Sequence, residues 1–263
     1  MLVFISGMPR SGSTFSHNVV RIALEKRSGS VVSITTEDSA PIFAQTADHI
    51  IAKAHGADEH LVTLVRCGAV KSVCTVRRPE DAVLSWMHVF GFSLDESLEA
   101  FSKWFLMFER ISQHSLVITL SEIERFPLLA AYRIGRHVCP DYTIIEAYRT
   151  ARALSKKQVK RITEAVERGE RQAIDIGFSR YDNTTFFHRR HISDRNQFDR
   201  RPEVTDAVRE RLGPWLNEFG EVHDRYLRRS LMQRAFIRLL RGCKGLISAP
   251  SALADGWMIR TRP

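Results

Sequence analysis

The beginning of the chain constrains the fold more than any other segment. Residues Leu2–Ile5 are apolar and lead into the loop Gly-Met-Pro-Arg-Ser-Gly-Ser-Thr at positions 7–14, after which a helical pattern runs to Leu24. In such a strand–loop–helix unit, backbone N–H groups of the loop and first helical turn point at one spot, and the helix dipole favours negative charge there. The segment predicts an anion-binding turn, although a glycine turn is also typical of a plain strand-to-helix connection.

The spacing of this loop is close to that of a Walker A loop. Gly7 is followed by four residues and then by Gly12, Ser13 and Thr14, but Ser13 stands where a nucleoside triphosphatase carries the lysine that reaches the β- and γ-phosphates. The nearest cation is Arg10, inside the loop. The sequence therefore predicts a phosphate-binding loop that lacks part of the residue set needed to hydrolyse ATP or GTP.

The next part of the chain alternates short apolar runs with helical patterns. Runs too short for helices lie at residues 31–34, 49–54, 72–76 and 116–120, and they are typical of buried strands of a parallel sheet. One helix is expected to begin at Pro79 and another to span residues 94–112. This order predicts a single α/β domain, a doubly wound, P-loop NTPase-like fold whose central parallel sheet is flanked by helices.

The second half is more polar and more helical. We expect a helix over residues 155–171, a basic and aromatic loop over residues 182–201, and helices beyond Pro202. Residues 225–244 hold seven Lys or Arg and no acidic residue. This amphipathic helix is expected either to lie on an anionic membrane surface or to pack on the domain with its arginines in water. The domain is predicted to span residues 1–245, with a C-terminal tail at 246–263.

Composition narrows the class of protein. The formal net charge is +9 at pH 7, which favours a polyanionic partner but does not choose among nucleotides, nucleic acid and anionic lipid. No apolar run approaches the ~18–20 residues of a membrane span. The four cysteines have no zinc or redox spacing, and no basic region precedes the first apolar run, so no signal peptide is expected. We expect a cytoplasmic protein without a metal site.

Four segments together resemble sulfotransferases that use 3′-phosphoadenosine 5′-phosphosulfate (PAPS). The loop Pro9–Thr14 resembles their 5′-phosphosulfate loop, and Lys53-Ala54-His55 resembles the Lys-x-His motif of the cytosolic enzymes. The segment from Val76 to Trp86 resembles the strand, turn and helix that bind the 3′-phosphate. Residues 189–198 loosely resemble the late basic loop, without its usual glycines and tryptophan. Arg10 stands where the cytosolic enzymes usually carry lysine.

The resemblance implies how PAPS is held. The N–H groups of residues 11–14 and the hydroxyls of the loop would bind the 5′ end, and Arg10 would offset charge on the leaving phosphate. Arg77 and Ser85 would bind the 3′-phosphate, because the guanidinium fork pairs bidentately with phosphate oxygens. Phe15 would stack on adenine, with a core position as the equal alternative. The residues expected at the nucleotide are Arg10, Ser11, Gly12, Ser13, Thr14, Phe15, Arg77, Ser85, Arg189 and Arg190.

The Lys-x-His segment implies the catalytic groups. A neutral imidazole suits removal of a proton from an attacking hydroxyl, so His55 is the candidate general base. Lys53 lies two residues earlier, on the same side of an extended chain, and would stabilise the transferring sulfuryl group. With Arg10, these residues would carry an in-line displacement on sulfur without a metal ion.

Three function classes remain at this point. The resemblance favours sulfuryl transfer from PAPS to a hydroxyl acceptor, with a carbohydrate or glycolipid as the expected acceptor. A P-loop kinase is the second class, which Ser13 disfavours. A non-catalytic nucleotide or nucleic-acid binder is the third, and we find no aromatic-rich RNA motif in its support. We expect a small-molecule or glycan partner, no nucleic acid, and membrane contact only through the basic C-terminal helix.

Overall fold

The computed structural model describes residues 1–175, 180–189 and 204–213. The chain divides into two units, Met1–Gly213 and Pro214–Pro263, and all described residues belong to the first. The expected basic helix at 225–244 and the tail at 246–263 lie outside the described residues.

Five parallel strands form the central sheet in the order β2-β3-β1-β4-β5. Each strand coincides to within a residue at either end with an apolar run of the sequence, except that β1 is longer than its run. The strands are β1 (Leu2–Gly7), β2 (Val31–Thr35), β3 (His49–Ala54), β4 (Lys71–Val76) and β5 (Leu116–Thr119). The predicted parallel α/β fold is confirmed. Gly7 pairs with Thr75 and Ser6 with Ala54, so the loop after β1 starts beside the ends of both neighbouring strands.

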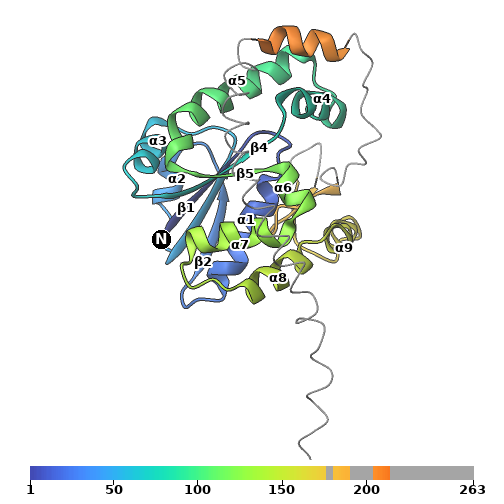
Figure 1. Cartoon of the computed structure of the whole chain (residues 1–263). Helices are drawn as coiled ribbons and strands as arrows, with labels where there is room; N and C mark the ends of the chain where they lie inside the picture. The colour runs from blue at the N-terminus through green and yellow to red at the C-terminus, as the bar shows by residue number, and fades with distance from the viewer. Residues whose placement is uncertain (176–179, 190–203, 214–263) are drawn as a thin grey trace, which may run out of the picture. The chain divides into compact units, whose positions relative to one another are not determined.

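Helices cover both faces of this sheet (Figure 1). Val3 and Ile5 of β1 belong to the core that includes side chains of α1 (Ser13–Glu25) and α7 (Pro127–Val138). Side chains alternate along a strand, and on the opposite face the Ser6 hydroxyl lies 3.7 Å from the sulfur of Met107 in α5 (Leu94–Ile111). Helix α3 (Glu59–Arg66) packs beside α5 on that face.

Local sequence signals explain where these helices begin. Pro79 occupies the first turn of α4 (Pro79–Phe90), as expected, and Ser93 and Glu96 form a capping box at the start of α5. One side of α5 is apolar and buried through Leu98, Phe101 and Phe105. The remaining helices are α2 (Ser39–Phe43), η1 (Ser112–His114), α6 (Leu120–Arg125), α8 (Ile144–Ala153) and α9 (Lys156–Glu167). Residues 204–213 are also helical.

A small antiparallel hairpin follows α9. It consists of β6 (Ala173–Asp175) and β7 (Arg180–Asp182), so the expectation of a loop from residue 182 is corrected: Asp182 ends a strand. The next turn crosses α1, where the Asn18 amide donates to the carbonyl of Thr185 at 2.7 Å. Across the described ranges, helices that combine the length and the apolar character needed to cross a bilayer are absent.

Candidate functional site

The loop between β1 and α1 requires glycine at two positions. Gly12 has φ 93°, in the left-handed region, and is the N-cap of α1. At Gly7 an added Cβ would lie 2.3 Å from the Cβ of Ser13, which is far inside van der Waals contact. The two glycines let the chain turn back on itself at the carboxyl end of β1, so that the first turn of α1 starts directly above the strand.

The start of α1 leaves backbone donors available. No side chain caps the helix, and the N–H groups of Phe15 and Ser16 donate to the carbonyl of Gly12. Within the described residues, the N–H groups of Gly12 and Ser13 have no acceptor. Such donors at a helix N-terminus form an anion-binding site.

Ser11 ties the loop to the neighbouring strand. Its N–H donates to the carbonyl of Met8 at 3.1 Å, and its hydroxyl lies 2.6 Å from the Met8 carbonyl and 2.6 Å from the hydroxyl of Thr75 in β4. In this structure Ser11 therefore holds the loop in shape, and its contact with a ligand stays a prediction. Ser13 and Thr14 are buried in the first turn of α1.

Arg10, Arg77 and Ser85 come together beside this loop. The Arg10 Nε donates to the Ser85 hydroxyl at 3.1 Å, and an Arg77 Nη1 donates to the carbonyl of Arg10 at 3.4 Å. Arg10 has φ 62°, and its guanidinium lies over the ring of Phe90 with 6.0 Å to the centroid. Burial, followed by the charge of Arg77, lowers the pKa of Arg10 to about 10. Residues expected at opposite ends of a nucleotide thus share one hydrogen-bonded cluster.

His55 follows the end of β3 and contacts the start of the same loop. Its Nδ1 lies 2.5 Å from the carbonyl oxygen of Gly7. A carbonyl only accepts, so Nδ1 carries the proton and Nε2 keeps a free lone pair. Burial, followed by the charge of Lys53, lowers the pKa of His55 to about 4, although the bond to Gly7 acts in the opposite direction. The imidazole is neutral near pH 7 and is presented as a base.

Lys53 is a half-buried cation next to this histidine. Within the described part of the chain its ammonium group makes no hydrogen bond or ion pair. Burial lowers the pKa of Lys53 to about 8. A partly desolvated positive charge is costly without an anion beside it, which suits a site that receives its negative charge from a ligand.

Several residues near the site were given no individual role from the sequence, although Trp86 ends the segment that resembles the 3′-phosphate-binding strand, turn and helix. The ring of Trp86 lies edge-on to His55 with centroids 6.0 Å apart, and Phe90 and Phe92 pack on Trp86 at 4.5 Å and 5.9 Å. We name Trp86, Phe90 and Phe92 the aromatic wall. The sequence signal for this wall is a group of three aromatic residues, separated by four and two positions, that begins directly after Ser85. His17 in α1 is also new: it is fully buried and bonds the Ser33 hydroxyl at 2.9 Å.

Other predicted site residues lie elsewhere. Phe15 is 9% exposed and belongs to the hydrophobic core, which is the alternative that the sequence left open; its adenine contact stays a prediction. Arg189 is exposed, and Arg190 lies outside the described residues. Clusters of three or more His, Cys, Asp or Glu that could hold a metal ion are absent from the described residues.

Comparisons with known proteins agree on the fold. No family model matches the chain, and no curated protein matches its sequence. Two solved structures of retinol dehydratase match this chain at 14% identity. The one in complex with retinol and PAP has a TM-score of 0.56, and the match covers 82% of this chain and 81% of the other. The one in complex with androsterone and inactive cofactor PAP has a TM-score of 0.53, and the match covers 82% of this chain and 80% of the other. Mouse sulfotransferase SULT7A1 complexed with PAP matches at 19% identity and TM-score 0.48, over 76% of this chain and 74% of the other. The chain therefore shares the fold of these two retinol dehydratase structures, both of which contain PAP.

Proposed function

We propose that the protein transfers the sulfuryl group of PAPS to a hydroxyl acceptor, with His55 as general base. The observation that carries this proposal is the contact between His55 Nδ1 and the Gly7 carbonyl at 2.5 Å. This contact fixes the tautomer, keeps Nε2 as the proton acceptor, and holds the imidazole at the beginning of the anion-binding loop.

The described side chains fit a donor that is anionic at two ends. Free N–H groups at Gly12 and Ser13, together with Arg10, suit the 5′ end. We assign Arg77 and Ser85 to the 3′-phosphate because their segment resembles the 3′-phosphate-binding strand, turn and helix; in this structure Ser85 accepts from Arg10 and Arg77 donates to its carbonyl. When bound, PAPS supplies an activated sulfuryl group on a phosphate leaving group. The presence of PAP in the two retinol dehydratase structures supports this choice of nucleotide.

Each bond, the proton and the negative charge are accounted for in the proposed reaction. The acceptor oxygen forms a bond to sulfur while the bond from sulfur to the bridging phosphate oxygen breaks. His55 Nε2 takes the hydroxyl proton, and PAP keeps the bonding electrons of the broken bond as negative charge. Lys53 stabilises the transferring group, and Arg10 offsets the charge on the departing phosphate. Preorganised donors of this kind commonly contribute a few kcal/mol each.

The aromatic wall supports a choice of acceptor class. Trp86 stands beside the base, and Phe92 is 36% exposed, so an acceptor approaching His55 meets aromatic faces. We propose a small-molecule acceptor whose hydroxyl is attached to an apolar or ring-shaped body, which includes the expected carbohydrates and glycolipids. The retinol and androsterone in the matched structures are of this kind. Cytoplasmic location and membrane contact through residues 225–244 stay predictions.

Calorimetric titration tests the nucleotide assignment. We expect PAP to bind the wild-type chain more tightly than ATP with Mg²⁺, ADP or an oligonucleotide. Arg77→Ala should weaken PAP by about 10- to 100-fold, because a charge-assisted contact to the 3′-phosphate is lost, and should leave ADP unchanged. Preference for ATP with Mg²⁺ would favour a kinase instead, and binding of the oligonucleotide alone would favour a nucleic-acid binder.

A further inference from the structure

We propose that the outer face of α8 docks on an anionic lipid membrane. This face, here called the α8 face, consists of Ile144, Ile145, Tyr148, Arg149 and Arg152. Residues four apart lie above one another on a helix, so Ile144, Tyr148 and Arg152 form one row, and Ile145 and Arg149 form the next. The proposal does not depend on the reaction that the protein performs.

The apolar side chains of α8 point outward. Ile144, Ile145 and Tyr148 are 42%, 60% and 57% exposed. Of eight large apolar side chains exposed among the described residues, these three lie in one short stretch, which makes α8 the main apolar feature of the described surface. The buried side of the helix holds only Ala147, Thr150 and Ala151. Small residues face the core and large ones face outward, the reverse of an ordinary surface helix.

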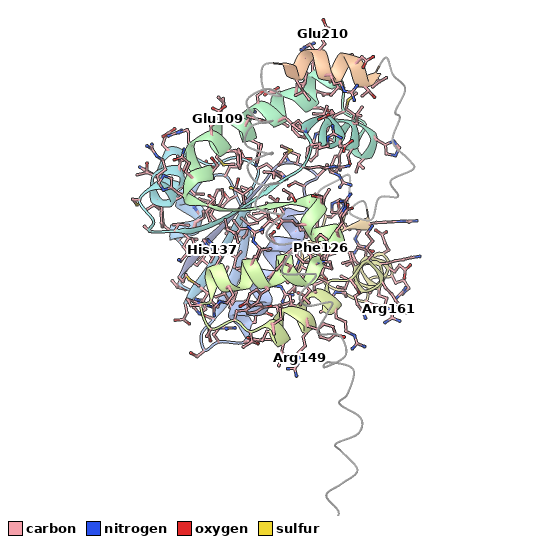
Figure 2. All side chains as sticks on the ribbon, viewed as in Figure 1. Glu109, Phe126, His137, Arg149, Arg161 and Glu210 are labelled. Atoms are coloured by element: carbon pink, nitrogen blue, oxygen red, sulfur yellow. The ribbon has the colours of Figure 1, made fainter. Side chains whose placement is uncertain are left out.

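Basic residues outnumber acidic ones around this face. Between Ala147 and Thr163 the chain has no acidic residue and six basic ones: Arg149, Arg152, Lys156, Lys157, Lys160 and Arg161. All six are exposed, and Figure 2 shows Arg149 beside α8 and Arg161 beside α9 on the outer margin of the molecule. The carboxylates next to α8 are engaged, since Asp141 and Glu146 pair with Arg27 at 2.9 and 3.3 Å.

Aliphatic and tyrosine side chains alternating with arginines suit the boundary between headgroups and acyl chains. Isoleucines enter the acyl region, tyrosine occupies the headgroup level, and arginines neutralise anionic lipids. Other occupants fit less well. A second copy would place Arg149 and Arg152 against their own equivalents. The chain's own residues 225–244 carry seven basic residues and no acidic one, so they would be repelled. Nucleic acid offers no apolar surface to two isoleucines.

A site-specific fluorescence experiment tests the proposal on the full chain. Ile145→Trp is compared with Leu106→Trp, which changes a 63% exposed residue of α5, and the signal of the unmodified chain is subtracted from each. With phosphatidylcholine vesicles that contain phosphatidylserine, we expect the emission of Ile145→Trp to shift to shorter wavelength and that of Leu106→Trp to stay unchanged. Vesicles of phosphatidylcholine alone should produce no shift. An unshifted Ile145→Trp, or equal shifts in both variants, would overturn the proposal.

Vesicle co-sedimentation adds a quantitative test. Each basic residue at an anionic surface contributes about fivefold in partitioning, so Arg149→Gln with Arg152→Gln should reduce binding about 25-fold, and added salt should weaken binding of the parent chain. The matched control is Arg66→Gln with Lys103→Gln, which also removes two exposed positive charges, on α3 and α5, and should bind as the parent does. Equal loss in both variants would contradict docking through α8. Two further results would contradict it. One is a dimer of the parent chain that becomes monomeric in Arg149→Gln with Arg152→Gln, and the other is binding of an acidic protein by a chain that does not bind vesicles.

Discussion

At the residue scale, a backbone carbonyl determines which nitrogen of His55 carries the proton. The Gly7 carbonyl fixes which nitrogen is free, and burial beside Lys53 keeps the ring neutral. Lys53 in turn is partly desolvated and has no described partner. In the proposed reaction the two residues would complement each other: His55 would accept a proton, and Lys53 would hold positive charge for the transferring group.

Replacement of His55 should separate chemistry from binding. In His55→Ala we expect turnover to fall by about 10²- to 10⁴-fold, which is the usual contribution of a general base, while the affinity for PAP stays near that of the parent. Steady-state kinetics and calorimetry measure the two quantities. His60→Ala, which changes an exposed histidine of α3, is the control and should leave both unchanged. A His55→Ala enzyme with parental turnover would remove this residue from the mechanism.

The pH dependence of activity should reflect both groups. His55 acts as a base above its pKa of about 4, and Lys53 is a cation below its pKa of about 8. The value of kcat/KM should therefore rise as pH increases through about 4 and fall as pH increases through about 8. In Lys53→Arg the upper fall should move to higher pH, because arginine stays protonated. An upper limb that is identical in Lys53→Arg would show that another group titrates there.

The sequence drew attention to Lys53, His55, Arg10 and Arg77 through short motifs, and their roles stay predictions. Their hydrogen-bond partners were not visible in those motifs. The bond from His55 to Gly7 joins a side chain to a backbone carbonyl, and a carbonyl has no signature in a sequence. The bond from Arg10 to Ser85 joins residues 75 positions apart, so it emerges only once β1 and β4 are known to be neighbours.

At the element scale, the sheet was predictable and its order was not. Continuous apolar runs fixed the strands of the sheet nearly to the residue, because a strand buried on both faces has no polar alternation. The order β2-β3-β1-β4-β5 depends on which strands pair, and no local pattern encodes that. The hairpin of β6 and β7 was missed because strands of three residues are too short to establish a period of two.

The packing of α7 offers a test at this scale. A Cβ added at Gly135 would lie 2.2 Å from the Cδ1 of Tyr142, whose ring is 1% exposed. Gly135→Ala should therefore lower the free energy of unfolding by about 1–3 kcal/mol, as overpacking does. Urea unfolding measures this effect. The control is Gly213→Ala, where nothing lies within 4 Å of the new Cβ. Equal stability of the two variants would show that α7 and Tyr142 are not packed in this way.

At the scale of the whole molecule, the basic side chains behind the net charge of +9 are unevenly distributed. Several exposed arginines are paired, such as Arg110 with Glu59 and Arg168 with Glu170. Arg10, Arg77 and Lys53 gather near the loop after β1, and six basic residues surround the α8 face. Composition could indicate an anionic partner, but only the fold separates the proposed nucleotide site from the proposed lipid-binding face.

The most direct measurement is the transfer of labelled sulfate from PAPS to a panel of sugars, glycolipids, lipid alcohols and phenols. We predict that the wild-type chain labels at least one hydroxyl acceptor and releases PAP in equal amount, and that His55→Ala labels it about 10²- to 10⁴-fold more slowly while it still binds PAP. Label transferred equally well by His55→Ala would contradict the assigned base. A wild-type chain that binds PAP but labels no acceptor of any class would contradict sulfuryl transfer itself.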